Sequence, residues 1–263
     1  MKIVAVAFKE NGKQYYFKAK KELKLKEGTR VVVDTVHGIE LATIVDENID
    51  NKNLVINDMM PVVRVATKKD FDAYENNKVL AQKGFIEFND ILRKFDGLDM
   101  TLVSCEYSLD QTKILFMYVS DDRVDFRELL KALASHFKKR IELKQIGARD
   151  KAKMIGGLGP CGMETCCSRF IKDFDNISIN MAKNQMLSLN PSNISGLCGR
   201  LLCCLKYENE AYTQAKKNYP KINSKIKYDG RECKVVGLNI LMDQVKIEDE
   251  RMIKLVSKED IKW

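Results

Sequence analysis

The chain has 263 residues and a formal net charge of +8, with 45% hydrophobic and 31% charged residues. This composition supports a folded core and excludes an intrinsically disordered protein, and no run approaches the roughly 20 apolar residues that span a bilayer. The N-terminus is apolar only as far as Lys9, so we expect a first strand there, no secretion signal and a cytoplasmic protein.

Residues 1–60 predict a small, β-barrel-like unit. Asn11-Gly12 and His37-Gly38 are turn dipeptides, and each is flanked by short apolar runs of the length typical of strands. The four strands are expected at Lys2–Phe8, Gln14–Lys18, Arg30–Thr35 and Ile39–Val45. Pro61 is expected to close this β-rich unit.

Residues 61–146 predict an α+β domain. A charged, amphipathic stretch over residues 67–96 indicates a helix that breaks or kinks at Gly84. Two antiparallel strands follow at residues 100–107 and 113–119. Asp125 and Glu128 have the spacing of a capping box at the start of a second helix, and Arg140–Ile146 alternates as a further strand.

Residues 147–210 form a cysteine-rich region of loops and helices that contains six of the eight cysteines. The same pattern occurs twice: Cys-Gly, three residues, then Cys-Cys. The six positions are Cys161, Cys166, Cys167, Cys198, Cys203 and Cys204. A glycine-rich approach, Gly156–Pro160, allows the backbone to come close to a bound centre, and Ser168–Phe174 is expected to be a short helix.

Residues 211–263 predict a second β-rich unit. Short strand patterns run from Ile222 to Val256, with a hairpin signal at Asp229-Gly230. The fold class is therefore α+β, with a small barrel-like N-terminal unit, a central α+β layer, a cysteine-rich region and a C-terminal unit of short strands.

A doubled pattern of soft ligands is what a metal or iron–sulfur site needs, and a reducing cytoplasm disfavours disulfides. One arrangement closes a single pseudo-symmetric site from Cys161, Cys198 and one member of each Cys-Cys pair. In another, each copy holds part of a cluster and a partner protein completes it. The absence of Cys-x-x-Cys favours an iron–sulfur cluster, such as 4Fe–4S, over zinc. Reduced, buried thiols are the remaining interpretation.

The other candidate residues indicate packing rather than catalysis. Cys105 and Cys233 lie in strand patterns, and His37 and His136 have no catalytic partner in the sequence. The sequence contains no catalytic triad pattern, paired-acid motif or nucleotide fingerprint. We therefore expect that the protein is not an enzyme.

Three basic stretches, residues 13–27, 138–153 and 216–234, raise a second hypothesis of direct RNA binding beside a structural zinc site. In that hypothesis Tyr15, Tyr16 and Phe17 could stack bases. Solvated strand edges and faces are the simpler interpretation of each stretch alone.

Four segments closely resemble the bacterial YaaT/RicT family: Cys161–Phe170, Ile177–Gln185, Leu187–Pro191 and Ile194–Glu208. The dense part of the match spans about 50 residues, and the flanking pattern fits over most of the chain. All six clustered cysteines match family positions.

The resemblance implies an accessory factor that assembles with small helical partners, RicA-like and RicF-like proteins, in a complex that carries iron–sulfur clusters. It links that complex to ribonuclease Y and the processing of polycistronic mRNA. In spore formers it also implies roles in sporulation, competence and biofilm development. The family favours the arrangement in which a partner completes the cluster, and it carries the ligand hypothesis onto each of the six cysteines.

Overall fold

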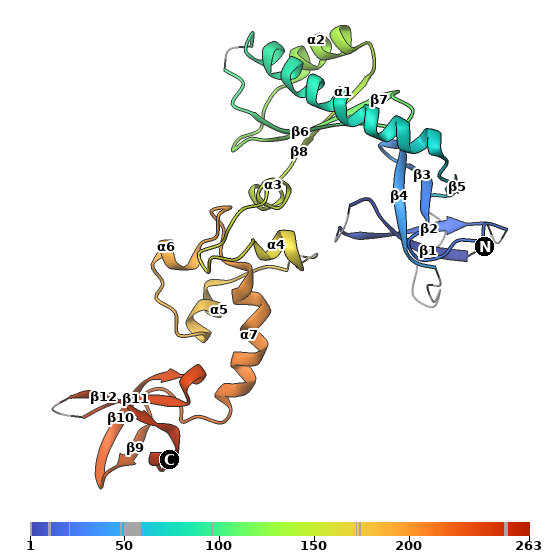
Figure 1. The fold of residues 1–263 in the computed structure, drawn as a ribbon. Coiled ribbons are helices and arrows are strands. Elements are labelled where there is room, and N and C mark those ends of the chain that lie inside the picture. The colour runs from blue at the N-terminus through green and yellow to red at the C-terminus, as the bar shows by residue number, and fades with distance from the viewer. Residues whose placement is uncertain are drawn as a thin grey trace. The chain divides into compact units, whose positions relative to one another are not determined.

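A computed structural model describes residues 2–9, 12–20, 22–47, 49, 59–95, 97–171, 173, 175–249 and 252–263. The chain divides into two compact units, residues 1–155 and 156–263. Across the described ranges the fold is mixed α and β, with seven α-helices and three sheets (Figure 1). The α+β fold class predicted from the sequence is therefore confirmed.

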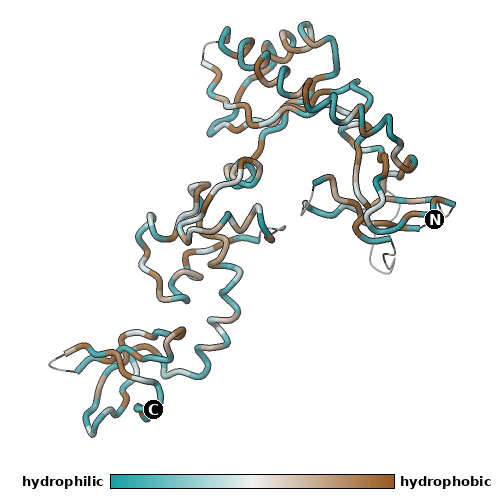
Figure 2. The backbone as a smooth tube through the Cα atoms, in the orientation of Figure 1, coloured by the Kyte–Doolittle hydropathy of each residue, from teal (hydrophilic) through white to brown (hydrophobic). Residues whose placement is uncertain are grey.

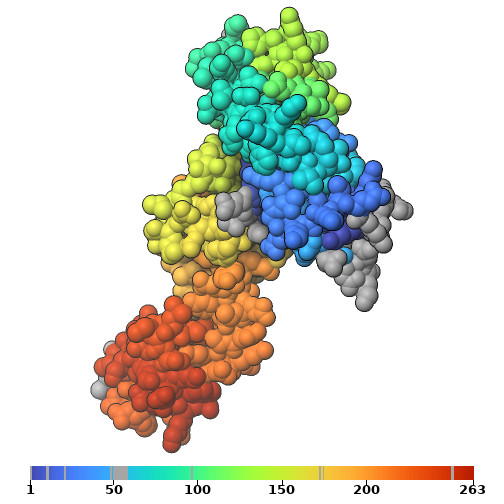
Figure 3. Space-filling model, turned by 45° about the vertical axis from the view of Figure 1, so that its right-hand side comes forward, coloured from blue at the N-terminus to red at the C-terminus, as the bar shows by residue number. Residues whose placement is uncertain are grey.

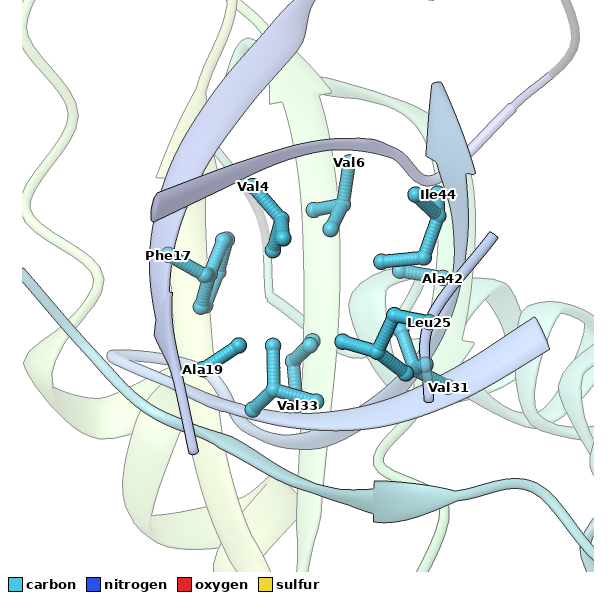
Figure 4. Packing of buried hydrophobic residues seen from close by; sticks show 10 residues of the cluster. Val4, Val6, Phe17, Ala19, Leu25, Val31, Val33, Ala42 and Ile44 are labelled. Atoms are coloured by element: carbon cyan, nitrogen blue, oxygen red, sulfur yellow. The ribbon is translucent and has the colours of Figure 1, made fainter. Parts of the chain in front are cut away.

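Unit 1 begins with a five-stranded antiparallel half-barrel in the order β2-β1-β4-β3-β5. The strands are β1 (Lys2–Ala7), β2 (Gln14–Ala19), β3 (Arg30–Thr35), β4 (Gly38–Asp46) and β5 (Val62–Val65). Alternate residues such as Val4, Val6, Val31 and Val33 point into one cluster (Figure 4), because side chains alternate between the faces of a strand. Of the predicted turn residues, Asn11 lies outside the described residues.

Phe17 is a core residue of this half-barrel, only 5% exposed, so it is not available to stack a base. Tyr15 and Tyr16 on the same strand are 46% and 43% exposed, and the Tyr15 ring packs edge-on against Phe8. The proposed three-residue aromatic platform on β2 is therefore wrong, because the Phe17 side chain of this edge strand points into the interior of the half-barrel.

The second layer of unit 1 is a three-stranded sheet with two helices. Its elements are α1 (Lys68–Leu92), β6 (Thr101–Tyr107), β7 (Lys113–Val119), α2 (Arg127–Phe137) and β8 (Arg140–Gln145), followed by α3 (Ala148–Ile155). Strands β6 and β7 are antiparallel, whereas β8 runs parallel to β7. A parallel neighbour requires a crossover, and α2 supplies it.

The predicted break at Gly84 is wrong, because α1 is continuous from Lys68 to Leu92. Gly84 is buried where the helix crosses β6, and a Cβ there would meet the Cys105 sulfur and the Tyr107 hydroxyl at 3.2 Å each. This glycine therefore permits close approach of the helix to the sheet and does not end the helix.

The predicted capping box at Asp125 and Glu128 is also wrong. Helix α2 begins at Arg127 after Phe126, and Glu128 pairs with Lys131 and does not reach back to the helix start. Asp125 does accept a hydrogen bond from the Arg127 N–H at 3.2 Å, and it also pairs with the Arg127 guanidinium at 2.6 Å. A capping box is present instead at the start of α1. There the Asp70 carboxylate accepts hydrogen bonds from the Thr67 N–H and hydroxyl, an arrangement that satisfies otherwise unpaired groups of the first turn.

Unit 2 consists of four helices and a four-stranded antiparallel sheet. The helices are α4 (Cys166–Arg169), α5 (Ile179–Asn184), α6 (Pro191–Ile194) and α7 (Cys203–Lys216). The strands are β9 (Lys225–Tyr228), β10 (Arg231–Asn239), β11 (Gln244–Glu248) and β12 (Ile253–Ser257), in sequential order. The helix predicted over Ser168–Phe174 starts two residues earlier and ends at Arg169.

The core of the C-terminal sheet is formed by eight buried residues, among them Val235, Val245 and Ile247. Helix α7 leads directly into this sheet, and Figure 2 shows the later turns of α7 in hydrophilic colours. In the space-filling view the orange atoms of α7 adjoin the red atoms of the sheet (Figure 3). Within the described ranges, none of the helices is long and apolar enough to cross a membrane.

Candidate metal centre

The two copies of the cysteine pattern fold into the same local structure. In the first, Leu158 and Glu164 form an antiparallel bridge, and the Gly159 N–H donates to the Met163 carbonyl at 2.7 Å. In the second, Ser195 and Leu201 form the bridge, with the matching hydrogen bond from Gly196 to Arg200 at 2.8 Å. Each Cys-Gly dipeptide thus lies at the tip of a tight hairpin.

The glycine of each dipeptide is required by the turn. Gly162 and Gly199 have φ values of 77° and 72°, in the left-handed region that glycine adopts without strain. Each donates its N–H back to the glycine three residues earlier, at 3.0 Å and 2.9 Å. The cysteine before each glycine therefore lies in a turn that is closed by local backbone hydrogen bonds.

The second half of each copy is the first turn of a helix. Cys166 begins α4 and Cys203 begins α7, and the residues before them, Thr165 and Leu202, have nearly the same backbone angles. Residues one and two of a helix have N–H groups without an intrahelical partner, and the positive end of the helix dipole favours anionic groups such as a thiolate. Both Cys-Cys pairs stand at such a position.

The structural repeat extends beyond the cysteines to Phe170 and Tyr207, which occupy equivalent positions 37 residues apart. Their rings contact each other edge-on, with centroids 5.1 Å apart. Helices α4 and α7 are also in contact. The second halves of the two copies therefore lie against each other within unit 2.

Thiols from both copies lie within electrostatic range of one another. Burial raises the pKa of Cys166, and the nearby Cys161 and Cys167 thiols raise it further. Burial likewise raises the pKa of Cys204, with additional contributions from Cys166, Glu208 and Cys161. Cys161 and Cys166 come from the first copy and Cys204 from the second, so these three thiols form one group, which we call the shared thiol group.

The remaining cysteines of the pattern are placed differently. Cys167 is buried, Cys198 is partly exposed beside Gly196, and Cys203 lines a cavity of about 330 Å³ together with Lys206 and Tyr207. The two members of the second pair thus point apart, because neighbours on a helix are about 100° apart around its axis. Cys105 and Cys233 belong to the cores of the α+β layer and the C-terminal sheet.

None of the eight cysteines, all of which lie in the described ranges, forms a disulfide. Within those ranges, no group of three or more His, Cys, Asp or Glu side chains is arranged to hold a metal ion. The thiols of the shared thiol group thus affect one another's pKa but are not drawn in around a single-ion site within the described residues. Both histidines are in unit 1, where His37 contacts Glu142 and His136 contacts Glu87.

Polar contacts join the C-terminal end of α5 to α7, close to Cys204 in the chain. The buried Gln185 side-chain amide donates to the Leu205 carbonyl at 2.6 Å, one residue after Cys204. Asn184 donates to the Asn209 side chain at 3.0 Å and to the Thr213 hydroxyl at 2.9 Å. The small apolar cluster here consists of Ala182, Ile194 and Leu205. Sequence reasoning missed Gln185 because a lone glutamine carries no pattern.

Comparison with known proteins gives consistent matches. Residues 60–146 match the PSP1 C-terminal conserved region, and residues 176–219 match the third domain of PSP1-like proteins. The stage 0 sporulation protein YaaT of Bacillus subtilis (strain 168) is 48% identical over 251 residues, which cover 94% of this chain and 89% of that protein. No solved structure matches the chain.

Proposed function

The chain belongs to the YaaT family of PSP1-domain proteins, and we propose on that premise that it is a non-catalytic accessory factor that binds an iron–sulfur cluster. Family membership supports a regulatory or accessory role. The proposal adds that the cluster-loaded chain assembles with RicA-like and RicF-like helical proteins and modulates mRNA processing by ribonuclease Y.

The observation that supports the cluster is the shared thiol group. The Cys166 and Cys161 thiols of the first copy contribute to the raised pKa of Cys204 in the second, although 30 residues of chain separate the two copies. Cysteine thiolates are the usual ligands of iron–sulfur clusters, and four are usual. Cys198 is the natural fourth candidate, because it holds in the second copy the position that Cys161 holds in the first.

The donor set fits a cluster better than a single zinc ion. All six candidate side chains are thiols, and the copies lack the two-residue ligand gaps that suit one tetrahedral ion. Ligands of a polynuclear cluster surround a larger core than ligands of one ion. Thiols that lie within electrostatic range without closing on one point suit the larger core. When bound, such a cluster would supply a redox-sensitive crosslink between the two copies.

Apolar side chains surround the cysteine hairpins and offer a surface for a partner. Met163 and Leu197 lie in the hairpins and are 53% and 61% exposed, and the edge-on pair Phe170 and Tyr207 is 47% and 66% exposed. Exposed aromatic and aliphatic side chains beside one another are typical of protein–protein contacts. We place the helical partners here, where an additional ligand from a partner could reach the cluster.

The direct test is iron, sulfide and zinc analysis of the chain prepared without oxygen, alone and with its helical partners. The proposal expects a brown protein with iron and sulfide in equal amounts. Cys198→Ser should abolish the iron content and the partner assembly while unit 1 keeps its cooperative unfolding. Cys233→Ala is the matched control, because that thiol lies in the C-terminal core and should not change the iron content.

A colourless complex that contains zinc under these conditions would contradict the cluster and favour a structural zinc site. The link to ribonuclease Y is tested separately in cells. Cells whose only copy carries Cys198→Ser should accumulate uncut polycistronic transcripts, and cells that lack the protein should do the same. Normal transcript processing in these cells would contradict the link to ribonuclease Y and would leave the proposed iron–sulfur cluster unaffected.

A further inference from the structure

The outer face of the C-terminal sheet is rich in lysine. On each strand, alternate residues enter the core, as Ile226, Val235 and Val245 do, so their neighbours point to the opposite face. That outer face carries Lys225 and Lys227 from β9, Lys234 from β10 and Lys246 from β11, all exposed. We call these four residues the lysine face.

The lysine face is only partly neutralised. Lys225 pairs with Glu232 at 2.7 Å, and Glu248 is the one other carboxylate among the described outward residues of these strands. Lys227, Lys234 and Lys246 form no side-chain ion pair with any described residue. Lys225 and Lys234 are directly opposite each other in the strand register, a like-charge pairing that destabilises a sheet, and Glu248 lies opposite Lys234 on its other side. A bound polyanion would relieve this repulsion.

An apolar groove runs along the same face. It has a volume of about 490 Å³, within the range of ligand sites. Its lining comes from the turn after α5, from α7 and from the outer face of the sheet, and includes Met186, Leu187, Tyr212, Leu241 and Leu255. Lys246 lines the groove and also belongs to the lysine face, so the apolar and the cationic surfaces are continuous.

Several apolar residues in the groove lie open to solvent. Leu241 is 79% exposed and Leu255 is 51% exposed, although burial of such side chains is worth about 1.5–3 kcal/mol each. Tyr212 is half-buried, and burial raises the pKa of its hydroxyl, followed by the Glu208 charge. An aromatic ring such as Tyr212 beside a positively charged surface is the combination that stacks bases and binds phosphates of a single strand.

We propose that the outer face of the C-terminal sheet binds single-stranded RNA, with phosphates on the lysine face and bases in the apolar groove against Tyr212 and the leucines. The charge distribution supports a polyanionic ligand, because residues 211–263 contain twelve Lys and Arg but eight Asp and Glu. This fifth of the chain therefore carries half of the net charge of +8. The site uses none of the six clustered cysteines and does not rest on the proposed cluster.

The test measures binding of a fluorescent single-stranded RNA to the full chain by anisotropy at several salt concentrations. The triple variant Lys227→Gln/Lys234→Gln/Lys246→Gln should weaken binding at least tenfold. It should also lower the slope of log K against log salt by about 2, because each lost phosphate contact on a single strand contributes about 0.7. The control Lys26→Gln/Lys69→Gln/Lys83→Gln removes the same charge from exposed positions of unit 1 and should leave both quantities unchanged.

A second variant separates base recognition from general attraction to anions. Leu241→Ser/Leu255→Ser keeps the charge and alters exposed positions, so the sheet should stay folded. It should weaken RNA binding several-fold with the same salt slope, and poly-glutamate of equal charge should compete poorly. The proposal is overturned if the lysine triple variant binds RNA like its control. It is equally overturned if poly-glutamate competes as well as RNA, which would indicate an acidic protein ligand.

Discussion

Among the described residues, the core cluster of the N-terminal half-barrel contains ten buried apolar residues, whereas that of the cysteine region, residues 156–210, contains three. A fully buried apolar side chain contributes about 1.5–3 kcal/mol, and fixing each backbone residue costs about 1–2 kcal/mol. The half-barrel can therefore be ordered by hydrophobic burial. The small cluster of the cysteine region cannot by itself order the surrounding chain, and small scaffolds of this kind usually rely on metals or crosslinks.

The half-barrel and the cysteine region are similar in length but are ordered by different kinds of contact. In the half-barrel, alternating apolar residues fill one interior (Figure 4). In the cysteine region, the contacts that order the chain are hairpin hydrogen bonds and the Gln185 and Asn184 contacts to α7. A cluster bound by both copies would add a crosslink where the hydrophobic core is smallest.

Removing the metal should separate the two regions most clearly. Amide hydrogen exchange in residues 156–210 should become at least about a hundredfold faster in metal-free protein, because a ligand present at a hundred times its Kd adds about 2.7 kcal/mol. Exchange in β1 and β4 of the half-barrel should not change. Equal acceleration in both regions would show that the metal stabilises the whole chain, and no acceleration would show that it does not order the cysteine region.

A core substitution in unit 1 should give the opposite pattern. Phe88 is fully buried and its ring packs against Phe116 with centroids 4.7 Å apart. Phe88→Ala should lower the free energy of unfolding of unit 1 by about 3–5 kcal/mol, measured by urea denaturation, with the iron content of the folded protein unchanged. A loss of iron in this variant would mean that unit 1 helps to build the thiol site.

Gln185 tests the polar support of the cysteine region. Gln185→Met keeps the length of the side chain but leaves the buried Leu205 carbonyl without its donor. The cost should be about 1–3 kcal/mol, seen as faster exchange in α7 together with reduced iron content. Asn184→Ala, which removes a partly exposed contact, is the milder comparison. If Gln185→Met loads iron normally, α5 does not position the shared thiol group.

The smallest expected effect concerns the start of α1 in unit 1. The Arg64 guanidinium, with the Thr67 N–H and hydroxyl, holds the pKa of Asp70 well below its usual range. A lowered carboxyl pKa stabilises the fold above the ordinary value of about 4 and ceases to do so as the pH falls. Asp70→Asn should therefore cost about 1 kcal/mol at neutral pH, and the difference from wild type should shrink below pH 4.

The exposed Asp72 on the same helix provides the matched control for this acid dependence. Asp72→Asn should change the unfolding free energy little at any pH, since exposed charges contribute little. A pH-independent loss in Asp70→Asn would assign the effect to packing at the helix start and not to the carboxylate charge.

The strands were largely predictable from the sequence, because alternation of apolar residues determines which face of a strand is buried. The continuity of α1 through Gly84 was not predictable, since it depends on Cys105 and Tyr107 across the interface. Helix α7 was also missed as a helix. It begins at Cys203 and contributes one fully buried residue, Leu205, so its apolar periodicity is weak.

The candidate site was predictable in its residues but not in its geometry. The doubled pattern identified the six cysteines, and the equivalent hairpins at Gly162 and Gly199 follow from the same local sequence. The contact between Phe170 and Tyr207, which brings the copies together, depends on how two distant segments pack. Only the structure therefore shows that Cys161, Cys166 and Cys204 affect one another's pKa.

The central claim is that thiols from both copies form one site, and a double-mutant comparison tests it most directly. Iron and sulfide are measured in Cys161→Ser, Cys204→Ser and the double variant, each prepared without oxygen together with the helical partners. Ligands of one site are not additive, so each single variant should lose as much iron as the double variant. Single variants that each keep about half of the iron, with the rest lost only in the double variant, would indicate two separate sites and contradict the account.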